Sequence, residues 1–295
     1  MLRVVRGKGF EPSNPYGTGS SSYNVKETLY SFRKYLEVDR QLNEKTIGLH
    51  LSNVKRLLQA LGKPPTEITV EELREYLSKF KDANPYTYAN VLKAMRVFFS
   101  GFVKTDISNG FRFPNYPFKP IMVPSKEELQ KFYCAMERAR DKALFLIYAT
   151  TGLRRNEVLS LKLEDMDLER RMIIPQKGNM GTTKNTWVSF FNEETKSVLA
   201  QYIQEANLDG SELFPSKSEV KRIFERAEKK TGIHITPQML REWFCSEMLS
   251  KGVQEVYVDA FCGRVPRSVL ARHYTDFSPD RLKEIYDKAG LKVLS

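Results

Sequence analysis

Two consecutive arginines, Arg154 and Arg155, stand where the stretch "TGLRRNEVLSL" predicts the beginning of a helix. Cations are unfavourable at that end of a helix, because the macrodipole places partial positive charge there. A guanidinium stays charged and can hydrogen-bond two phosphate oxygens at once. The position therefore indicates that arginine serves a function here, and binding an anion is the chemistry that suits it.

The composition also favours an anionic partner. The 295 residues carry a formal net charge of +11, and each phosphate that Lys or Arg neutralises releases counterions. Charge alone favours nucleic acid but does not separate it from a membrane surface. No apolar run is long enough to span a membrane, and the first residues lack the apolar core of a signal peptide, so we expect no membrane association.

The cysteines and histidines argue against metal and disulfide chemistry. Three cysteines without a CxxC spacing, Cys134, Cys245 and Cys262, favour a reduced intracellular compartment, the cytoplasm. None of the three histidines lies at zinc-ligand spacing with a cysteine. We therefore expect no bound metal.

Four separated motifs follow one another in the second half of the chain. They are "TGLRRNEVLSLKLEDMD" (151–167), "QKGNMGTTK" (176–184), "ITPQMLREWF" (235–244) and "CGRVPRSVLARHYTDFS" (262–278). In order, spacing and context they resemble the tyrosine recombinase (phage integrase) family, notably integrases of archaea, archaeal viruses and plasmids. The motifs extend the resemblance from residue 125 to about residue 287, and an expected helical core-binding domain extends it to residues 23–103.

The resemblance implies cleavage of DNA without metal or cofactor. In this family a tyrosine hydroxyl attacks a phosphodiester and forms a 3′-phosphotyrosyl intermediate with a free 5′-hydroxyl. Arginines stabilise the charge that spreads over the nonbridging oxygens, and a lysine protonates the leaving oxygen. The implied function is a site-specific recombinase, the integrase of a mobile element. The alternatives are a dimer-resolution recombinase, a type IB topoisomerase-like enzyme and a catalytically inactive DNA-binding regulator.

Three catalytic residues carry over by position. Arg154 matches the family's first arginine, Arg241 of "TPQMLR" matches the second, and Tyr274 of "ARHYTDFS" matches the nucleophile. Tyr257 and Tyr286 are rival nucleophiles, but neither follows a glycine–arginine turn at near-family spacing. We therefore expect the covalent bond to form at Tyr274.

The general acid and the acidic supports come from the resemblance in the same way. Lys177 matches the lysine of the family's hairpin, and Lys184 is the alternative because the turn is long. Glu157 and Asp165 match acidic positions that brace the first arginine, as structural supports rather than proton carriers.

Two positions depart from the family's commonest pattern. The residue three before the second arginine is usually histidine and here is Gln238, which can hydrogen-bond phosphate but cannot move a proton near neutral pH. A later histidine or tryptophan is here Arg264, which adds a cation at the phosphate or braces the pocket. His273 neighbours Tyr274, but adjacent helical residues point in different directions. We therefore expect no histidine general base.

Four amphipathic helices are predicted between residues 23 and 103. Their stretches are "VKETLYSFRKYLEV", "NEKTIGLHLSNVKRLLQALG", "TVEELREYLSKF" and "NPYTYANVLKAMRVFFSGF". Gly62 fits a C-cap, Thr69 fits an N-cap, and Asn84 or Pro85 begins the fourth helix. Residues 104–124 contain four prolines and little periodicity, so they are predicted to form an interdomain linker.

A second domain is predicted over residues 125–295. "SKEE" is a capping box that begins at Ser125, and the helix after it is expected to run to about Tyr148. "RRMIIPQKGNMGTTKNTWVSF" (170–190) predicts a β-hairpin, and helices return from Glu193 onward. Ser278 as N-cap and Gly290 as C-cap enclose a last helix. The fold class is thus mainly α with a small β-sheet: a helical core-binding domain plus an α+β catalytic domain.

The family resemblance also implies how the two domains work together. They would clamp double-stranded DNA at its attachment sites, with Lys93, Arg96 and Arg155 as candidate phosphate contacts. In the family, a helix after the nucleophile packs on a neighbouring subunit. A homo-oligomer, a tetramer on DNA, is therefore expected.

The first 22 residues are predicted to be a flexible leader rich in glycine, proline and serine. The DNA that encodes these residues could itself carry a signal, because Gly9-Phe10-Glu11-Pro12 can be encoded by GGG-TTC-GAR-CCC. That string fits the T-arm of a tRNA gene, and integrases of one archaeal type carry their attachment site inside their own gene. We therefore hypothesise that the leader is a translated attachment site for integration at a tRNA gene.

Overall fold

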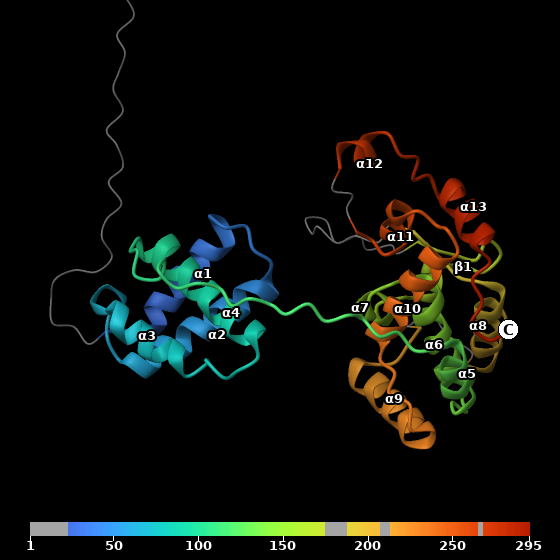
Figure 1. The fold of residues 1–295 in the computed structure, drawn as a ribbon, viewed down its shortest axis with the longest axis horizontal. Coiled ribbons are helices and arrows are strands. Elements are labelled where there is room, and N and C mark those ends of the chain that lie inside the picture. The colour runs from blue at the N-terminus through green and yellow to red at the C-terminus, as the bar shows by residue number, and fades with distance from the viewer. Residues whose placement is uncertain (1–22, 175–187, 207–212, 265–267) are drawn as a thin grey trace, which may run out of the picture. The chain divides into compact units, whose positions relative to one another are not determined.

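The computed structural model describes residues 23–174, 188–206, 213–264 and 268–295. The chain divides into two compact units between Lys119 and Pro120 (Figure 1). Helices dominate both units and one small sheet lies in the second, as the sequence predicts. Within the described part of the chain, no helix combines the length and hydrophobicity that crossing a bilayer needs.

The first unit is a bundle of four α-helices with two short helical segments. Its elements are α1 (Val25–Val38), α2 (Glu44–Leu61), the 3₁₀ turn η1 (Pro65–Glu67), α3 (Val70–Ser78), α4 (Pro85–Arg96) and the π-helix η2 (Val97–Val103). The apolar face of each helix fills one core, in which Phe32, Leu57, Leu92 and Phe98 are fully buried. The apolar residues that the amphipathic pattern places on one face of each helix are thus the residues that are buried.

Local capping chemistry sets where these helices begin and end. The Thr69 hydroxyl accepts from the Glu72 backbone N–H, and the Glu72 carboxylate accepts from the Thr69 N–H at 2.9 Å. Asn84 caps α4 by accepting from the Tyr86 N–H. Gly62 ends α2 with φ of +65°, a conformation that costs glycine least. The predicted caps at these three positions are therefore present.

The segment after η2 still packs on the first unit. Arg96 of α4 donates to the carbonyl oxygen of Phe111 and lies over the Phe113 ring at 4.6 Å. Ser108 is fully buried. The boundary between the units therefore lies about fifteen residues beyond Lys104, where the sequence predicts that the linker begins.

The second unit is built around one buried helix. Its helices are α5 (Lys126–Cys134), α6 (Ala139–Thr151), α7 (Arg155–Leu159), the 3₁₀ turn η3 (Leu163–Asp165), α8 (Glu193–Ala206), α9 (Lys217–Thr231), α10 (Pro237–Ser250), α11 (Glu255–Phe261), α12 (Val269–His273) and α13 (Pro279–Ala289). Nearly every residue of α6 is buried, and α8 and α10 pack against it (Figure 1). Because α6 is covered, the turn at its C-terminal end is held firmly in place.

The prediction of a single helix from Ser125 to about Tyr148 is wrong. The chain forms two helices, α5 and α6, separated by residues 135–138. Ala135 ends α5 and Met136 turns into the core, where it is 4% exposed. The break contains neither glycine nor proline, so the burial of Met136 and not a local breaker accounts for it.

The sheet has three short antiparallel strands in the order β1-β2-β3. β2 (Met172–Ile173) pairs with β3 (Ser189–Phe190), which confirms the predicted hairpin. β1 (Met166–Asp167) adds a strand that the sequence analysis did not predict. Residues 175–187, where the sequence predicts the hairpin turn, lie outside the described residues.

The last helix packs inside its own unit. Leu282 and Tyr286 of α13 are buried, and the Tyr286 hydroxyl donates to the carbonyl oxygen of Thr150 at 2.7 Å. The Glu194 carboxylate accepts from the N–H groups of Val293 and Leu294, which fixes the segment after α13. The apolar face of α13 thus completes the core of its own unit, and the expected packing of a helix on a neighbouring subunit stays a prediction.

Candidate active site

A left-handed glycine places Arg154 at the end of the buried helix α6. Gly152 ends α6 with φ of +68°, and a Cβ there would lie 2.5 Å from the Phe244 ring. Only glycine satisfies both the backbone angle and the close approach. Arg154 follows at the N-cap of α7, where its backbone N–H and Nη1 donate to the two oxygens of Glu157 at 2.6 and 2.8 Å.

Arg241 of α10 is buried, with 5% of its surface exposed. Its Nη1 donates to the carbonyl oxygen of Gly152, and its Nη2 donates to that of Cys262 at 2.8 Å. Burial lowers the pKa of Arg241, and the nearby charge of Arg154 lowers it further. Among the described residues this cation bonds two carbonyls and no carboxylate, so its charge can meet an anionic group.

The turn after α11 brings the arginines together. The carbonyl of Cys262 accepts from Arg241, and the next carbonyl, that of Gly263, accepts from Arg154 Nη2 at 3.3 Å. Arg264 comes next in the chain, and its Nη1 donates to Asp259 at 2.7 Å. Consecutive peptides of one turn therefore hold Arg154 and Arg241 and carry Arg264, although the three residues lie far apart in the sequence.

Three guanidinium groups around one turn favour an anion that has several oxygens. The Asp259 carboxylate raises the pKa of Arg264, so this guanidinium stays charged. Arg154 and Arg264 keep part of their side chains exposed. A phosphate that approaches this turn would therefore meet fixed positive charge that needs little reorganisation.

Tyr274 lies at the C-cap of α12 and is 78% exposed. In the described part of the chain, its side chain has no hydrogen bond with the arginines of the turn. None of the α12 residues is buried, so the short helix is held only weakly by packing. The structure thus leaves the predicted nucleophile available at the surface but does not bring it into contact with the arginines.

The two rival tyrosines have structural roles. Tyr286 is 2% exposed, donates to Thr150, and has its pKa raised by burial. Tyr257 packs edge-on against Phe277. A hydroxyl buried in a core cannot reach a phosphodiester, so Tyr286 is excluded by its position.

Gln238 and the acidic supports differ in how they relate to the turn. Gln238 is exposed, and its amide donates to Glu242 one turn further along α10. Glu157 braces Arg154 directly. Asp165 is buried, and its carboxylate accepts from the Lys162 N–H at 2.8 Å. Of the two predicted supports, Glu157 therefore contacts the first arginine, and the hydrogen bond of Asp165 serves the turn before β1.

The described contacts of this turn include none of the remaining predicted residues. Lys177 and Lys184, the alternative general acids, lie outside the described residues, as does the leader. Arg155 is exposed beside Arg154. In the first unit Lys93 is exposed, whereas Arg96 is partly covered and engaged with Phe111.

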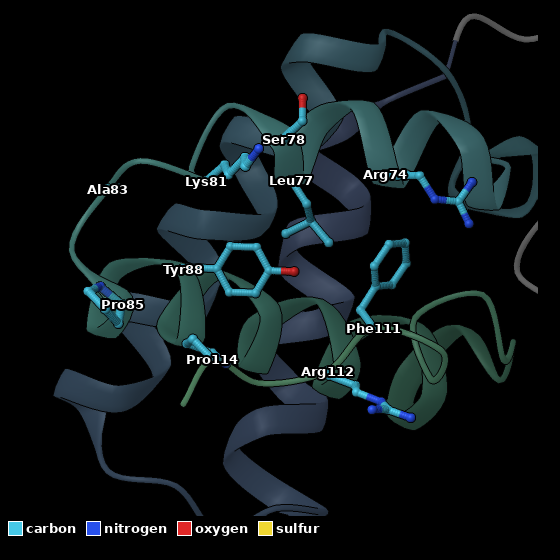
Figure 2. A pocket seen from close by; sticks show the side chains of 10 residues that line it. All are labelled: Arg74, Leu77, Ser78, Lys81, Ala83, Pro85, Tyr88, Phe111, Arg112 and Pro114. Carbon is cyan, nitrogen blue, oxygen red and sulfur yellow. The ribbon is translucent and has the colours of Figure 1, made fainter. Parts of the chain in front are cut away.

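The first unit also contains a groove, of about 420 Å³, that is separate from the arginine turn. Leu77, Tyr88 and Phe111 face one another across it (Figure 2). Arg74 lies over the Phe111 ring at 5.9 Å, and Lys81 and Arg112 also line the groove. None of the predicted site residues lines it.

Comparison with protein families identifies the chain on both units. Residues 124–281 match the phage integrase family, and residues 29–109 match the N-terminal SAM-like domain of phage integrases. The chain belongs to the phage integrase family. The predicted family resemblance is therefore confirmed, and with it the predicted enzyme class, a tyrosine recombinase that transfers DNA strands.

Relatives and solved structures agree with this family assignment. The tyrosine recombinase XerA of Saccharolobus solfataricus is 28% identical over 259 residues, which cover 83% of this chain and 86% of the relative. XerA of Pyrococcus furiosus is 24% identical over 279 residues, or 90% of this chain and 94% of the relative. A lambda integrase tetramer bound to a Holliday junction has a TM-score of 0.67 at 17% identity, over 87% of this chain and 78% of that one. The Tn1549 transposon integrase in complex with circular intermediate DNA has a TM-score of 0.62 at 17% identity, over 87% and 98%.

Sequence reasoning missed several groups that build this candidate site. Asp259 anchors Arg264, and the carbonyls of Gly152, Cys262 and Gly263 anchor the other two arginines. Backbone carbonyls leave no signal in side-chain types. Asp259 stands five residues before its partner, across the end of α11, where no helical spacing rule joins the two.

Proposed function

We propose that this protein is a site-specific integrase that cleaves and rejoins double-stranded DNA through a 3′-phosphotyrosyl intermediate at Tyr274. The observation that carries the proposal is the gathering of Arg154 and Arg241 on consecutive carbonyls of the turn that carries Arg264. A phosphodiester is the substrate that would stabilise these three arginines.

Each step of the reaction has a group in this chain. The Tyr274 hydroxyl attacks phosphorus, the bond to the 5′-oxygen breaks, and the three arginines stabilise the added charge on the nonbridging oxygens. Lys177, or Lys184 in its place, gives the leaving 5′-oxygen its proton. Rejoining reverses these steps, with a 5′-hydroxyl from another strand attacking the phosphotyrosine.

Gln238 and Arg264 take different parts in this proposal. Arg264 is placed on the turn itself and is held by Asp259, so it acts as a third phosphate ligand. Gln238 is exposed and turned toward Glu242, so it would reach phosphate only after that hydrogen bond breaks. Without a histidine at either position, proton transfer falls to the hairpin lysine.

The exposure of Tyr274 fits a nucleophile that engages when DNA is bound. The weakly packed α12 can shift at low cost, since moving it buries or exposes little of the core. Val269 and Leu270 on the same helix are 71% and 70% exposed, and a second copy of the chain would cover them in a tetramer on DNA. The lambda integrase tetramer on a Holliday junction is the precedent for that assembly.

Integration at a tRNA gene is the finer form of the proposal. It rests on the possible codons of Gly9-Phe10-Glu11-Pro12, which fit a tRNA T-arm. The DNA that encodes the first 22 residues tests it directly. A coding sequence without a match to a tRNA gene over these four codons removes the basis for that target.

A second candidate function is resolution of circular dimers between two identical sites. The tyrosine recombinases named XerA among the relatives favour it. Plasmids that carry either two identical sites or an unlike pair of attachment sites separate the two functions. An integrase recombines the unlike pair, and a resolvase recombines the identical sites. Relaxation of supercoils without exchange would indicate a topoisomerase-like activity.

The covalent intermediate is the test of the chemistry itself. A nicked suicide substrate should trap wild-type protein on DNA in the presence of EDTA, and Tyr274→Phe should trap none. Tyr257→Phe, a matched loss of one hydroxyl, should still form the adduct. A protein that forms no adduct would be a DNA-binding regulator, and an adduct with Tyr274→Phe would place the nucleophile elsewhere.

A further inference from the structure

Two cysteines lie against each other beside the arginine turn. The Sγ atoms of Cys245 and Cys262 are 3.3 Å apart, although seventeen positions separate them in the sequence. Cys245 lies on α10 one turn after Arg241, and Cys262 caps α11. A disulfide holds its sulfurs about 2.05 Å apart, so closing this pair needs an approach of about 1.3 Å.

The two thiols differ in access, as the partners of a redox pair often do. Cys245 is partly exposed, and Cys262 is fully buried behind it. The hydrogen bond from Cys262 lowers the pKa of Cys245 to about 7, with a smaller contribution from the charges of Arg264 and Arg241. An attacking thiol with a pKa near ambient pH reacts fastest in thiol–disulfide exchange. Cys245 is thus placed to react first, and Cys262 to resolve.

We propose that Cys245 and Cys262 form an oxidisable dithiol whose disulfide switches off DNA cleavage. The Cys245 thiolate attacks a small-molecule disulfide such as oxidised glutathione, forming a mixed disulfide and releasing one thiolate. Cys262 then loses its proton and attacks Cys245 Sγ, which forms the protein disulfide and expels the second thiolate. The protein dithiol is oxidised, and one small-molecule disulfide is reduced to two thiols.

The position of Cys262 connects this reaction to the proposed function. Its carbonyl holds Arg241, and the next carbonyl holds Arg154. A pull on the Cys262 side chain therefore acts on the turn that positions both guanidiniums. A displacement of about 1 Å at reacting groups can cost about 10²-fold in rate. The dithiol itself does not depend on the proposed function, but the effect on cleavage does.

The chemical test uses the full chain, incubated with oxidised glutathione, alkylated, digested with trypsin and analysed by mass spectrometry. We expect the peptide of residues 242–251 joined to that of residues 252–264, and dithiothreitol should separate them. Cys134, which is exposed and has no cysteine partner among the described residues, should carry only glutathione or the alkylating group. A mixed disulfide that persists on Cys245, with no joined peptide, overturns the proposal.

The functional test compares adduct formation on the suicide substrate before and after oxidation. Wild type should lose at least 10-fold in rate and recover with dithiothreitol, and Cys134→Ser should behave in the same way. Cys245→Ser should cleave, before and after oxidation, at the rate of wild-type protein whose cysteines are reduced. Equal cleavage rates for wild-type protein with the Cys245–Cys262 disulfide and for wild-type protein with both thiols reduced would overturn the proposed switch. A reduced protein that never cleaves contradicts the proposed function instead, whatever the peptide analysis gives.

Discussion

The guanidinium of Arg241 donates to the carbonyl oxygen of Cys262 at 2.8 Å, and this bond ties helix α10 to the turn that carries Arg264. The other side of the same guanidinium donates to Gly152, the residue that ends α6. One buried side chain thus joins three segments of the candidate site. A planar fork with several donors can do this, and a single ammonium cannot.

Arg241→Lys should therefore lower the rate of adduct formation by about 10²-fold, because the three donors of an ammonium share one nitrogen and do not match the fork that spans both carbonyls and a phosphate. The rate is measured by single-turnover cleavage of the suicide substrate. Arg222→Lys on the exposed face of α9 is the matched control and should cleave at the wild-type rate. Equal rates for Arg241→Lys and wild type would show that the charge alone matters.

Gly152→Ala should destabilise the second unit more than the same change at another left-handed glycine. Its Cβ would meet the Phe244 ring at 2.5 Å, whereas a Cβ on Gly232, also a C-cap with positive φ, would meet nothing within 4 Å. The left-handed backbone costs either alanine about 1 kcal/mol, and overpacking adds about 1–3 kcal/mol at Gly152 only. Urea unfolding followed by tryptophan fluorescence measures the difference, and equal losses would contradict it.

Phenylalanine substitutions at Tyr274 and Tyr286 should have opposite effects on covalent adduct formation and on stability. Tyr286→Phe leaves the Thr150 carbonyl without its buried donor, which costs about 1–2 kcal/mol of unfolding free energy, yet it should still form the covalent adduct. Tyr274→Phe changes an exposed side chain and should leave the urea midpoint unchanged while removing the adduct. Urea unfolding and substrate trapping on the same preparations check both halves. A Tyr286→Phe protein that folds but forms no adduct would reopen the choice of nucleophile.

Features governed by neighbouring residues could be predicted from this sequence. The caps at Thr69, Asn84 and Ser125 depend on side chains within three positions, and all three are present. The break after Cys134 could not be predicted, because it accompanies the burial of Met136 in the core. The strand β1 pairs with the nearby β2, but its two residues are too few to show an alternating pattern.

For the candidate site, too, some features could be predicted from the sequence and others could not. The motifs predicted Arg154, Arg241 and Arg264 as site residues, and the structure gathers these three arginines at one turn. Their anchors could not be predicted, since the carbonyl of Cys262 reaches Arg241 only through the packing of α10 against α11. The adjacency of Cys245 and Cys262 follows from that same packing. These contacts could not be predicted because the residues that form them lie far apart in the sequence.

The last prediction concerns His50, which is buried in the first unit with 3% of its surface exposed. Its Nδ1 is buried and has no hydrogen-bond partner among the residues that the structure describes. Burial lowers the pKa of His50 below its usual value of about 6.5, and the charges of Lys93 and Arg40 lower it further. The folded unit therefore binds the imidazole proton less tightly than the unfolded chain, which takes up a proton near pH 6.5. His50 thus favours folding fully above that pH and loses its contribution as the pH falls below it.

The first unit should consequently unfold at lower urea concentration at pH 5.5 than at pH 7.5, and His50→Leu should show a smaller shift. Both tryptophans, Trp187 and Trp243, belong to the second unit, so fluorescence follows that unit and circular dichroism at 222 nm adds the helices of the first. Most carboxylates titrate below this window, so the comparison isolates the imidazole. The quantity to compare is the difference between the urea midpoints at the two pH values. A single midpoint is not informative, because the substitution also changes packing. An identical shift in wild type and His50→Leu would assign the acid sensitivity to other groups.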